Sequence, residues 1–167
     1  GGAPVISLAV GQPSAPAPAV ALSAARDMLH HGVISYTDAM GHASLRARIA
    51  SHYRDAYAVQ VPGERVMVTT GSSAGFNLAF LAAFDPGARI AIAAPGYPAY
   101  RNIMRALGIE PVEIETGPQD GYVLTAERLA AEHRKSPVQG VLVASPANPT
   151  GTVTPRGQLK ELIEFAD

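Results

Sequence analysis

The stretch Val138-Gln139-Gly140-Val141-Leu142-Val143 runs directly into Ala144-Ser145-Pro146-Ala147-Asn148-Pro149-Thr150-Gly151. Its first six residues predict a strand, and just beyond the loop a helical pattern opens, with Thr154-Pro155 as the predicted cap of that helix. A loop stiffened by two prolines therefore delivers one amide side chain, Asn148, to the carboxyl end of a strand. In open α/β sheets, ligands bind at that edge. Taken alone, the loop is equally compatible with an ordinary β-to-α connection, because Asn-Pro and Thr-Gly are common loop dipeptides.

Working outward from this loop, the same alternation of strand and helix extends upstream. Gly108 is placed to end one helix, Thr125 to cap the next, and Leu124 and Leu129 to form a hydrophobic staple at that cap. Strand followed by helix four times predicts an α/β fold, with a mostly parallel sheet and helices on both faces. The predicted elements are strands at 66–69, 89–93, 111–115 and 138–143, and helices at 73–84, 99–107, 125–134 and from 154 onward.

The part of the chain before residue 66 follows a different pattern. It predicts a short extended segment at Val5–Val10, a helix from Pro18 to His31 and a loop from Ile34 to Gly41. A second helix follows, amphipathic, with its apolar residues on one face and its arginines largely off it. We expect those arginines to form a solvated surface. The apolar face consists of Leu45, Ile49, Tyr53 and Ala56, and the arginines are Arg46, Arg48 and Arg54.

The composition excludes several classes of function. The 167 residues are 47% apolar and 16% charged, which is typical of a globular domain. A formal net charge of −1 provides no basic field for nucleic acid and no polybasic membrane signal. The absence of cysteine excludes disulfides and thiolate metal sites and fits a cytoplasmic protein. Neither a membrane-spanning run nor a signal-peptide pattern is present. We therefore expect no nucleic-acid, membrane or metal partner.

Two more loops at strand ends carry residues suited to ligand binding. In Thr69-Thr70-Gly71-Ser72-Ser73-Ala74-Gly75, small residues at a helix start allow backbone N–H groups to approach an anion, and the Ser72 and Ser73 hydroxyls add donors. The loop matches neither the P-loop nor the G-x-G-x-x-G fingerprint. Close packing of strand on helix is the alternative explanation for these small residues.

The other loop, Ala94-Pro95-Gly96-Tyr97-Pro98-Ala99-Tyr100, presents two aromatic side chains. Tyr97 is placed either to stack on a flat ring or to pack against a neighbouring helix. Tyr100 lies inside the helix start and is expected to pack against a neighbouring helix. An anion cradle, a stacking ring and the Asn148 amide at one sheet edge together suit a phosphorylated planar heterocycle.

Five motifs resemble the N-terminal part of a pyridoxal 5′-phosphate-dependent aminotransferase of class I/II, the fold type I family. They occur in the order and spacing of that family across essentially the whole chain. The motifs are Val10-Gly11-Gln12-Pro13, Tyr36-Thr37-x-x-x-Gly41-x-x-x-Leu45-Arg46, Gly71-Ser72-Ser73, Pro95-Gly96-Tyr97-Pro98 and Ser145-Pro146-Ala147-Asn148-Pro149-Thr150-Gly151.

The resemblance implies how the cofactor, pyridoxal 5′-phosphate, is held. The backbone amides and hydroxyls of Ser72 and Ser73 would bind its phosphate, and Tyr97 would stack on its pyridine ring. Asn148 would hydrogen-bond the 3′-oxygen of the ring, which favours the ionised oxygen and so tunes the Schiff base.

The resemblance also assigns substrate and subunit contacts. Gly11 would lie near the substrate carboxylate, where a side chain would obstruct, and Asn148 would border the substrate too. Tyr36 would reach across a dimer interface to the phosphate of the neighbouring subunit. Many relatives carry proline where this chain has Asp38.

The domain organisation implied by the resemblance is incomplete. Residues 1–40 would form an N-terminal segment and helix that contribute to the small domain or to dimer contacts, and residues 41–167 the first part of the large cofactor-binding domain. The Schiff-base lysine of the family lies further downstream, so we expect no catalytic residue in this chain. Lys135 and Lys160 are expected to be solvated surface charges. The chain is thus expected to be a fragment.

The implied activity is transfer of an amino group between an amino acid and a 2-oxo acid, in a homodimer with shared active sites that serves amino acid metabolism. Two alternatives on the same fold stay open. One is a pyridoxal phosphate-dependent lyase or decarboxylase, and the other is a non-catalytic regulator domain that binds the cofactor. The sequence features that separate these three lie outside the chain.

Overall fold

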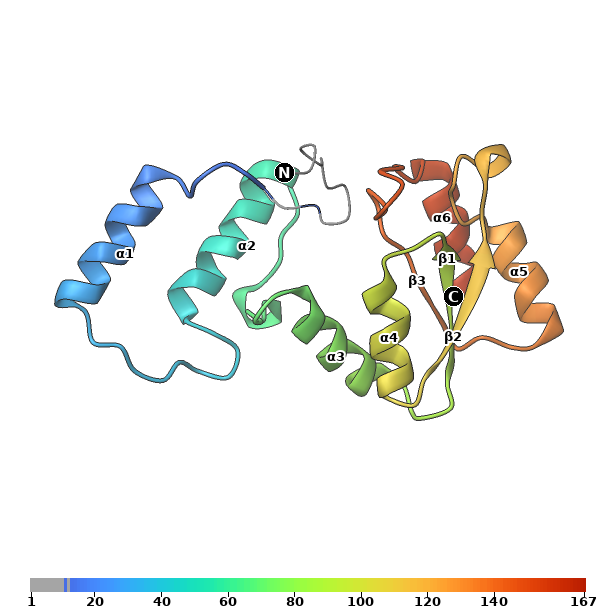
Figure 1. The fold of residues 1–167 in the computed structure, drawn as a ribbon, viewed down its shortest axis with the longest axis horizontal. Helices are drawn as coiled ribbons and strands as arrows, with labels where there is room; N and C mark the ends of the chain where they lie inside the picture. Colours follow the sequence, from blue (N-terminus) through green and yellow to red (C-terminus); the bar gives the residue numbers. More distant parts are fainter. Residues whose placement is uncertain (1–10, 12) are drawn as a thin grey trace, which may run out of the picture. The chain divides into compact units, whose positions relative to one another are not determined.

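The computed structural model describes residue 11 and residues 13–167, so the predicted extended segment Val5–Val10 lies outside the described residues (Figure 1). The chain divides into two compact units, with the boundary between Val66 and Met67. The assignment of residues 1–40 and 41–167 to different domains of the whole protein stays a prediction.

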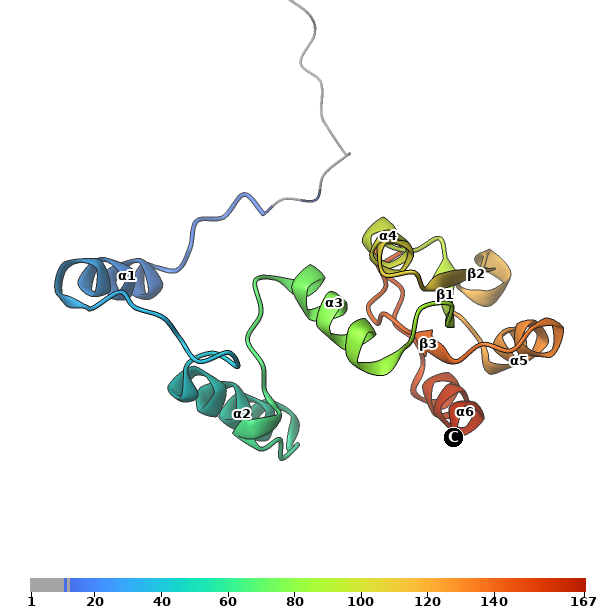
Figure 2. The ribbon, with the colours of Figure 1, turned by 90° about the horizontal axis from the view of Figure 1, so that it is seen from below.

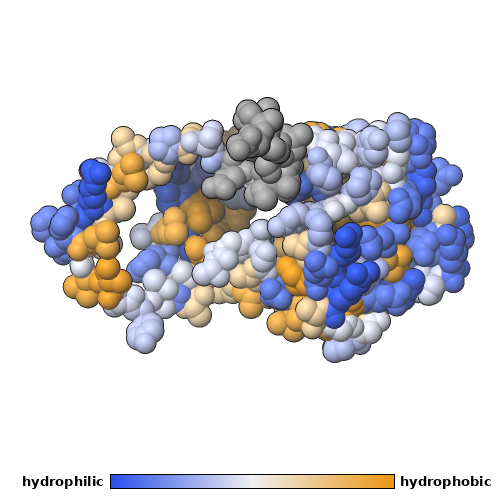
Figure 3. All heavy atoms as spheres, in the orientation of Figure 1, coloured by the Kyte–Doolittle hydropathy of each residue, from blue (hydrophilic) through white to orange (hydrophobic). Residues whose placement is uncertain are grey.

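The first unit contains the two helices that the sequence predicts. These are α1, Ala19–His31, and α2, Ala43–Tyr57, followed by the short 3-10 helix η1, Gly63–Arg65. No residue of α1 is buried. Hydrophobic side chains are exposed over α1 and the loop after it (Figure 3); they include Val20, Met28, Leu29, Val33 and Ile34.

The prediction of a solvated arginine face on α2 is wrong for Arg46. Its Nε donates to the Gly41 carbonyl at 3.1 Å, and its Nη1 donates to the Gly63 carbonyl at 3.2 Å. The sequence pattern misses this role because both acceptors are backbone atoms outside the helix. Arg54 is exposed, and its Nε donates to the Asp55 carboxylate at 2.8 Å, which lowers the pKa of Asp55.

The second unit contains a three-stranded parallel sheet with strand order β2-β1-β3, which confirms the predicted α/β fold. No helix in the described part of the chain is long and apolar enough to cross a membrane. The elements of this unit are α3 Ser72–Ala83, β1 Arg89–Ala94, α4 Pro98–Ala106, β2 Glu110–Glu115, the 3-10 helix η2 Pro118–Asp120, α5 Ala126–Lys135, β3 Gly140–Leu142 and α6 Arg156–Ala166.

Helices cover both faces of the sheet, with α4 on one side and α5 and α6 on the other (Figure 2). The alternation of side chains along β1 explains the two cores, because successive residues point to opposite faces. Ile90 and Ile92 pack with Phe80 of α3 and with Met104 of α4. Ala91 faces the other way, into the second core, which also contains Val112, Ile114, Leu124, Leu129 and Leu162.

Two predicted helix ends are confirmed in detail. Gly108 has a φ of +74°, and the N–H of Gly108 and of Ile109 donate to the carbonyls of Arg105 and Met104 at 3.1 and 2.8 Å. This is the Schellman arrangement, which favours glycine at the left-handed position. The Thr125 side chain accepts a hydrogen bond from the Arg128 N–H at 3.3 Å and so caps α5.

A predicted strand and a predicted helix cap are wrong. Residues 66–69 are extended at Val66 but form no strand, because no described strand pairs with them, and Met67 and Val68 are exposed. Thr154 does not cap the last helix. Pro155 occupies the cap position of α6 without a side-chain bond, while the N–H of Thr154 donates to Ser145 Oγ at 2.9 Å.

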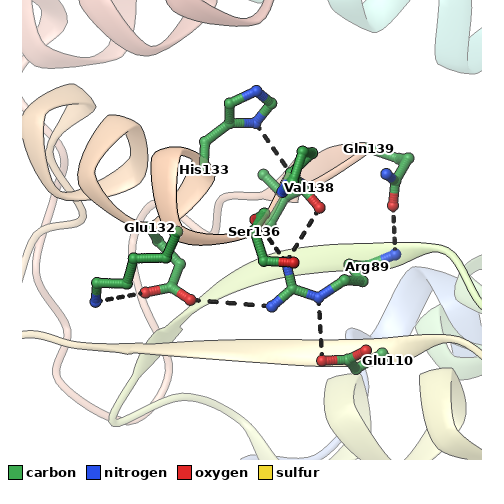
Figure 4. A network of polar contacts seen from close by, with 9 residues as sticks. Arg89, Glu110, Glu132, His133, Ser136, Val138 and Gln139 are labelled. Atoms are coloured by element: carbon green, nitrogen blue, oxygen red, sulfur yellow. Dashed lines mark hydrogen bonds and ion pairs between the residues drawn. The ribbon is translucent and has the colours of Figure 1, made fainter.

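Arg89 joins the amino ends of the three strands (Figure 4). Its Nε donates to Glu110 at the start of β2 at 3.1 Å. Its Nη1 donates to the carbonyls of Ser136 and Pro137, just before β3, at 2.6 and 3.1 Å. The backbone of Arg89 also exchanges hydrogen bonds with Gln139. This network, the Arg89 clamp, fixes the strands at the end opposite to the candidate loops.

Candidate functional site

The carboxyl ends of β1 and β3 place two of the predicted loops side by side. The strands are parallel, with Ile92 of β1 paired to Leu142 of β3, so the loops that follow leave the same edge of the sheet. A small cavity of about 30 Å³ between them, here called the loop hollow, has room for only a water molecule or two. It is lined by Ile92, Ala93, Pro95, Gly96, Tyr100, Leu142, Ala144, Ala147 and Asn148.

The loop that carries Asn148 is held by its own backbone. The N–H of Ala147 donates to the Thr152 carbonyl at 2.9 Å, and the N–H of Gly151 donates to the Ala147 carbonyl at 2.7 Å. Gly151 has a φ of +70°, a conformation that glycine adopts without strain. Asn148 itself is exposed, and no hydrogen bond joins its amide to another described residue. The loop is therefore ordered around an amide whose donors are available to a ligand.

The start of α3 has the properties of an anion site. Gly71 precedes the helix with a φ of +82°, and no side chain caps the first turn, so the N–H groups of Ser72, Ser73 and Ala74 lack helical partners. Ser72 and Ser73 are exposed. Unpaired N–H groups and the positive end of the helix dipole attract a negatively charged group such as a phosphate. Thr69 Oγ1 donates to the Gly71 carbonyl at 2.9 Å and steadies the turn.

Tyr97 and Tyr100 lie at the start of α4. Tyr97 is the residue before α4, and 40% of its surface is exposed. Tyr100 packs against Phe76 of α3, with ring centroids 5.0 Å apart, which confirms the expectation that it contacts a neighbouring helix. The centroids of the Tyr97 and Tyr100 rings are 5.5 Å apart, and the two ring planes are almost perpendicular. The start of α3 and the exposed Tyr97 ring are thereby linked through aromatic contacts.

The other predicted site residues belong to the first unit. Gly11 is exposed, and a Cβ atom added there would meet nothing within 4 Å. The Tyr36 side chain is fully exposed. Their roles toward substrate and cofactor stay predictions.

The two lysines are surface charges, as expected. Lys135 pairs with Glu132 at 3.0 Å and Lys160 with Glu164 at 3.4 Å, and about three quarters of each lysine side chain is exposed.

Two contributors to this edge escaped sequence reasoning. Gly96 is one, since a Cβ atom there would lie 2.5 Å from the Ala93 carbonyl oxygen. The sequence Pro95-Gly96 does not reveal this close approach. Tyr100 is the other, because it lines the loop hollow as well as packing on α3.

Taken together, the second unit presents unpaired N–H donors at the start of α3, an exposed Tyr97 ring and an unpaired Asn148 amide, a set of groups that suits a phosphorylated ring compound. A family model described as "Aminotransferase class I and II" matches residues 3–167. The chain belongs to the class I and II aminotransferase family. Enzymes of this family depend on pyridoxal 5′-phosphate, and the donors at the start of α3, the Tyr97 ring and the Asn148 amide fit its phosphate, ring and ring oxygen.

Individual relatives agree with this assignment. The chain is 48% identical, over 163 residues, to valine–pyruvate aminotransferase of Mycobacterium tuberculosis, covering 98% of the chain and 42% of that protein. It is 34% identical to a probable aspartate/prephenate aminotransferase of Thermus aquaticus, covering 99% of the chain and 43% of the relative.

Solved structures of the family superpose on the chain. An aminotransferase from Mycobacterium tuberculosis matches with a TM-score of 0.90 and 49% identity, over 95% of this chain and 40% of the other. The aspartate aminotransferase of Thermus thermophilus with maleate matches with a TM-score of 0.84 and 34% identity, over 94% and 41%. The chain thus spans about 40% of the length of the proteins it matches.

Proposed function

We propose that the whole protein is a pyridoxal phosphate-dependent aminotransferase, and that this chain supplies part of its cofactor site. The carrying observation is a set of available groups in the second unit: the uncapped start of α3, and, in the two loops that leave the carboxyl ends of β1 and β3, the exposed Tyr97 ring and the unpaired Asn148 amide. When bound, the cofactor supplies an electron sink and a carrier for the amino group. The names of the relatives favour transamination over elimination, decarboxylation or a regulatory role.

Each residue then has a distinct task. The N–H groups and hydroxyls of Ser72 and Ser73 hold the phosphate through charge-assisted hydrogen bonds. The Tyr97 ring covers one face of the pyridine, and the Asn148 amide donates to the ring oxygen and stabilises its ionised form. None of these residues moves a proton from the substrate. Their contribution is to bind, orient and tune the cofactor.

The substrate side of the proposal is an amino acid and a 2-oxo acid. Gly11 and Asn148 would border the substrate carboxylate. Valine and pyruvate are the first pair to assay, because the name of the relative with 48% identity contains both.

The proposal extends to assembly and location. We propose a homodimer in which Tyr36 contacts the phosphate in the partner subunit; the full exposure of Tyr36 and the exposed apolar residues of α1 support this. We propose a cytoplasmic location for the protein.

The test uses the full-length protein loaded with pyridoxal phosphate. Adding an amino acid should convert the visible absorbance of the cofactor to that of its pyridoxamine form, and adding pyruvate should restore it. The matched control is the same protein mixed with pyruvate alone, which should leave the spectrum unchanged. If a panel of amino acids that includes valine, aspartate and alanine produced no conversion, the aminotransferase proposal would be wrong.

A further inference from the structure

A continuous row of aromatic rings runs through the second unit to the candidate site. Along α3, the rings of Phe84, Phe80 and Phe76 follow one another at intervals of four residues, with centroids 6.5 and 5.9 Å apart. The next ring is that of Tyr100 in α4, whose centroid lies 5.0 Å from that of Phe76. The last ring is that of Tyr97, whose centroid lies 5.5 Å from that of Tyr100. Its inner part is fixed in the core, because Phe80 is only 5% exposed.

Tyr100 is the link between the buried and the exposed parts of this row. Its ring meets Phe76 at an interplanar angle of 66° and Tyr97 at 82°. Edge-to-face contacts of this kind are directional, so they restrict the tilt of the rings as well as their separation. Tyr100 also lines the loop hollow together with Asn148.

The Tyr97 ring needs such a restraint. It stands at the start of α4 with 40% of its surface exposed, and an exposed tyrosine exchanges rotamers freely. An aromatic side chain that stacks on a planar ligand gives the highest affinity when its ring is already held in the stacking orientation before the ligand binds. The entropy cost of ordering the side chain is then not paid during binding.

We propose that Tyr100 is a positioning residue for the cofactor ring. Its side chain sets the plane of Tyr97, and through Phe76 it ties that plane to α3, whose first turn holds the phosphate. The spacing between the ring-stacking surface and the phosphate site is thereby fixed by the core. This inference rests on the proposed function, in which Tyr97 stacks on pyridoxal phosphate.

The contribution comes from the Tyr100 ring and not from its hydroxyl. No hydrogen bond joins the Tyr100 hydroxyl to another described residue. Tyr100→Phe should therefore preserve the edge-to-face contacts with Phe76 and Tyr97. Tyr100→Leu should keep an apolar side chain at this position but lose those directional contacts.

The experiment compares full-length wild-type protein with Tyr100→Phe, Tyr100→Leu and the control Phe84→Leu. Phe84→Leu removes an aromatic contact at the far end of the row. Pyridoxal phosphate affinity and the visible circular dichroism band of the bound cofactor are measured for each. Tyr100→Leu should weaken affinity about two- to tenfold and reduce the band. Tyr100→Phe should match the wild type, and Phe84→Leu should lower the unfolding temperature with an unchanged band.

A second measurement needs no cofactor. In protein labelled with fluorotyrosine, the Tyr97 resonance, assigned through Tyr97→Phe, should shift and sharpen in Tyr100→Leu because the ring becomes freer. An unchanged resonance together with an unchanged dichroism band would overturn the role of Tyr100. A wild-type protein that binds no pyridoxal phosphate, with a shifted Tyr97 resonance in Tyr100→Leu, would overturn the proposed function while the ring restraint stood.

Discussion

The ring of Phe84 lies so close to Gly140 that a Cβ atom added at Gly140 would come within 2.7 Å of Phe84 Cζ and 2.9 Å of Cε1. Phe84 ends α3, and Gly140 begins β3. The absence of a side chain at position 140 therefore lets the end of the helix pack directly on the strand. Ile90 closes the same space from β1, with its Cδ1 3.1 Å from that position.

Gly140→Ala should destabilise the protein by about 1 to 3 kcal/mol, since a well-packed core accepts an extra methyl group only by moving its neighbours. Urea unfolding of the full-length protein measures the loss. Phe84→Leu in the same chain should recover part of it, because leucine frees the space that the ring fills. A double variant whose loss equals the sum of the single losses would show that the two positions are not coupled.

Gly96→Ala should weaken cofactor binding, because its Cβ would lie 2.5 Å from the Ala93 carbonyl, and a backbone atom has little room to retreat. The turn must then shift and carry Tyr97 with it. Gly157→Ala is the matched control, since nothing lies within 4 Å of a Cβ there and the residue is helical. That control should leave cofactor affinity unchanged and stabilise the protein by about 0.5 to 1 kcal/mol. Fluorescence titration with pyridoxal phosphate distinguishes the two variants.

Ser73→Asp should affect stability and cofactor affinity in opposite directions. A carboxylate in the first turn of α3 favours the helix by about 0.3 to 1 kcal/mol. The same charge repels a phosphate bound there and should lower affinity by about five- to a hundredfold. Asn102→Asp, an exposed change on α4, is the charge control and should do neither. Equal affinity in wild type and Ser73→Asp would mean that the phosphate binds elsewhere.

Asn148→Ala should leave the fold intact and raise the pKa that governs the colour of the bound cofactor. In the proposed site the amide would stabilise the ionised ring oxygen, so without it the cofactor should hold its proton to a higher pH, by about one to two units. Absorbance titration of the full-length enzyme measures the shift, and activity should fall with it. Asn102→Ala serves as the control. An unchanged titration in Asn148→Ala would mean that this amide does not touch the cofactor.

Arg89→Lys should destabilise the protein by about 1 to 3 kcal/mol, because an ammonium group cannot reproduce the contacts to Glu110 and to the Ser136 and Pro137 carbonyls. The exposed Arg134 offers a comparison, and Arg134→Lys should change stability by less than about 0.5 kcal/mol. Cofactor affinity should stay constant in both, since Arg89 lies at the other end of the sheet. Thermal and urea unfolding give the result.

The sequence predicted those parts of the fold that depend on local chemistry. Thr125 caps α5 and Gly108 ends α4 through contacts within a few residues. Strand formation at 66–69 depends instead on a pairing partner, and no described strand provides one. The capping of α6 by Thr154 failed for a related reason, since Ser145, nine residues away, binds its N–H.

For the candidate site, the sequence could predict that the Asn148 amide is available, whereas its role toward a ligand stays a prediction. Asn148 was recognised as an available amide in a rigid loop, and its exposure agrees with that. Tyr100 was assigned only to packing, because no sequence pattern reports that its ring faces Phe76 and Tyr97 at once. The sequence also does not show that a side chain at position 96 would clash, because the clash arises from the close approach of the Ala93 carbonyl oxygen to Gly96 in the folded turn.

The Arg89 clamp has a consequence for how such a protein diversifies. It secures the strands at their amino ends, whereas the two candidate loops leave the carboxyl ends. Substitutions in those loops therefore leave the interactions that hold the strands untouched. The stability of the sheet and the chemistry of its loops can therefore change independently of each other.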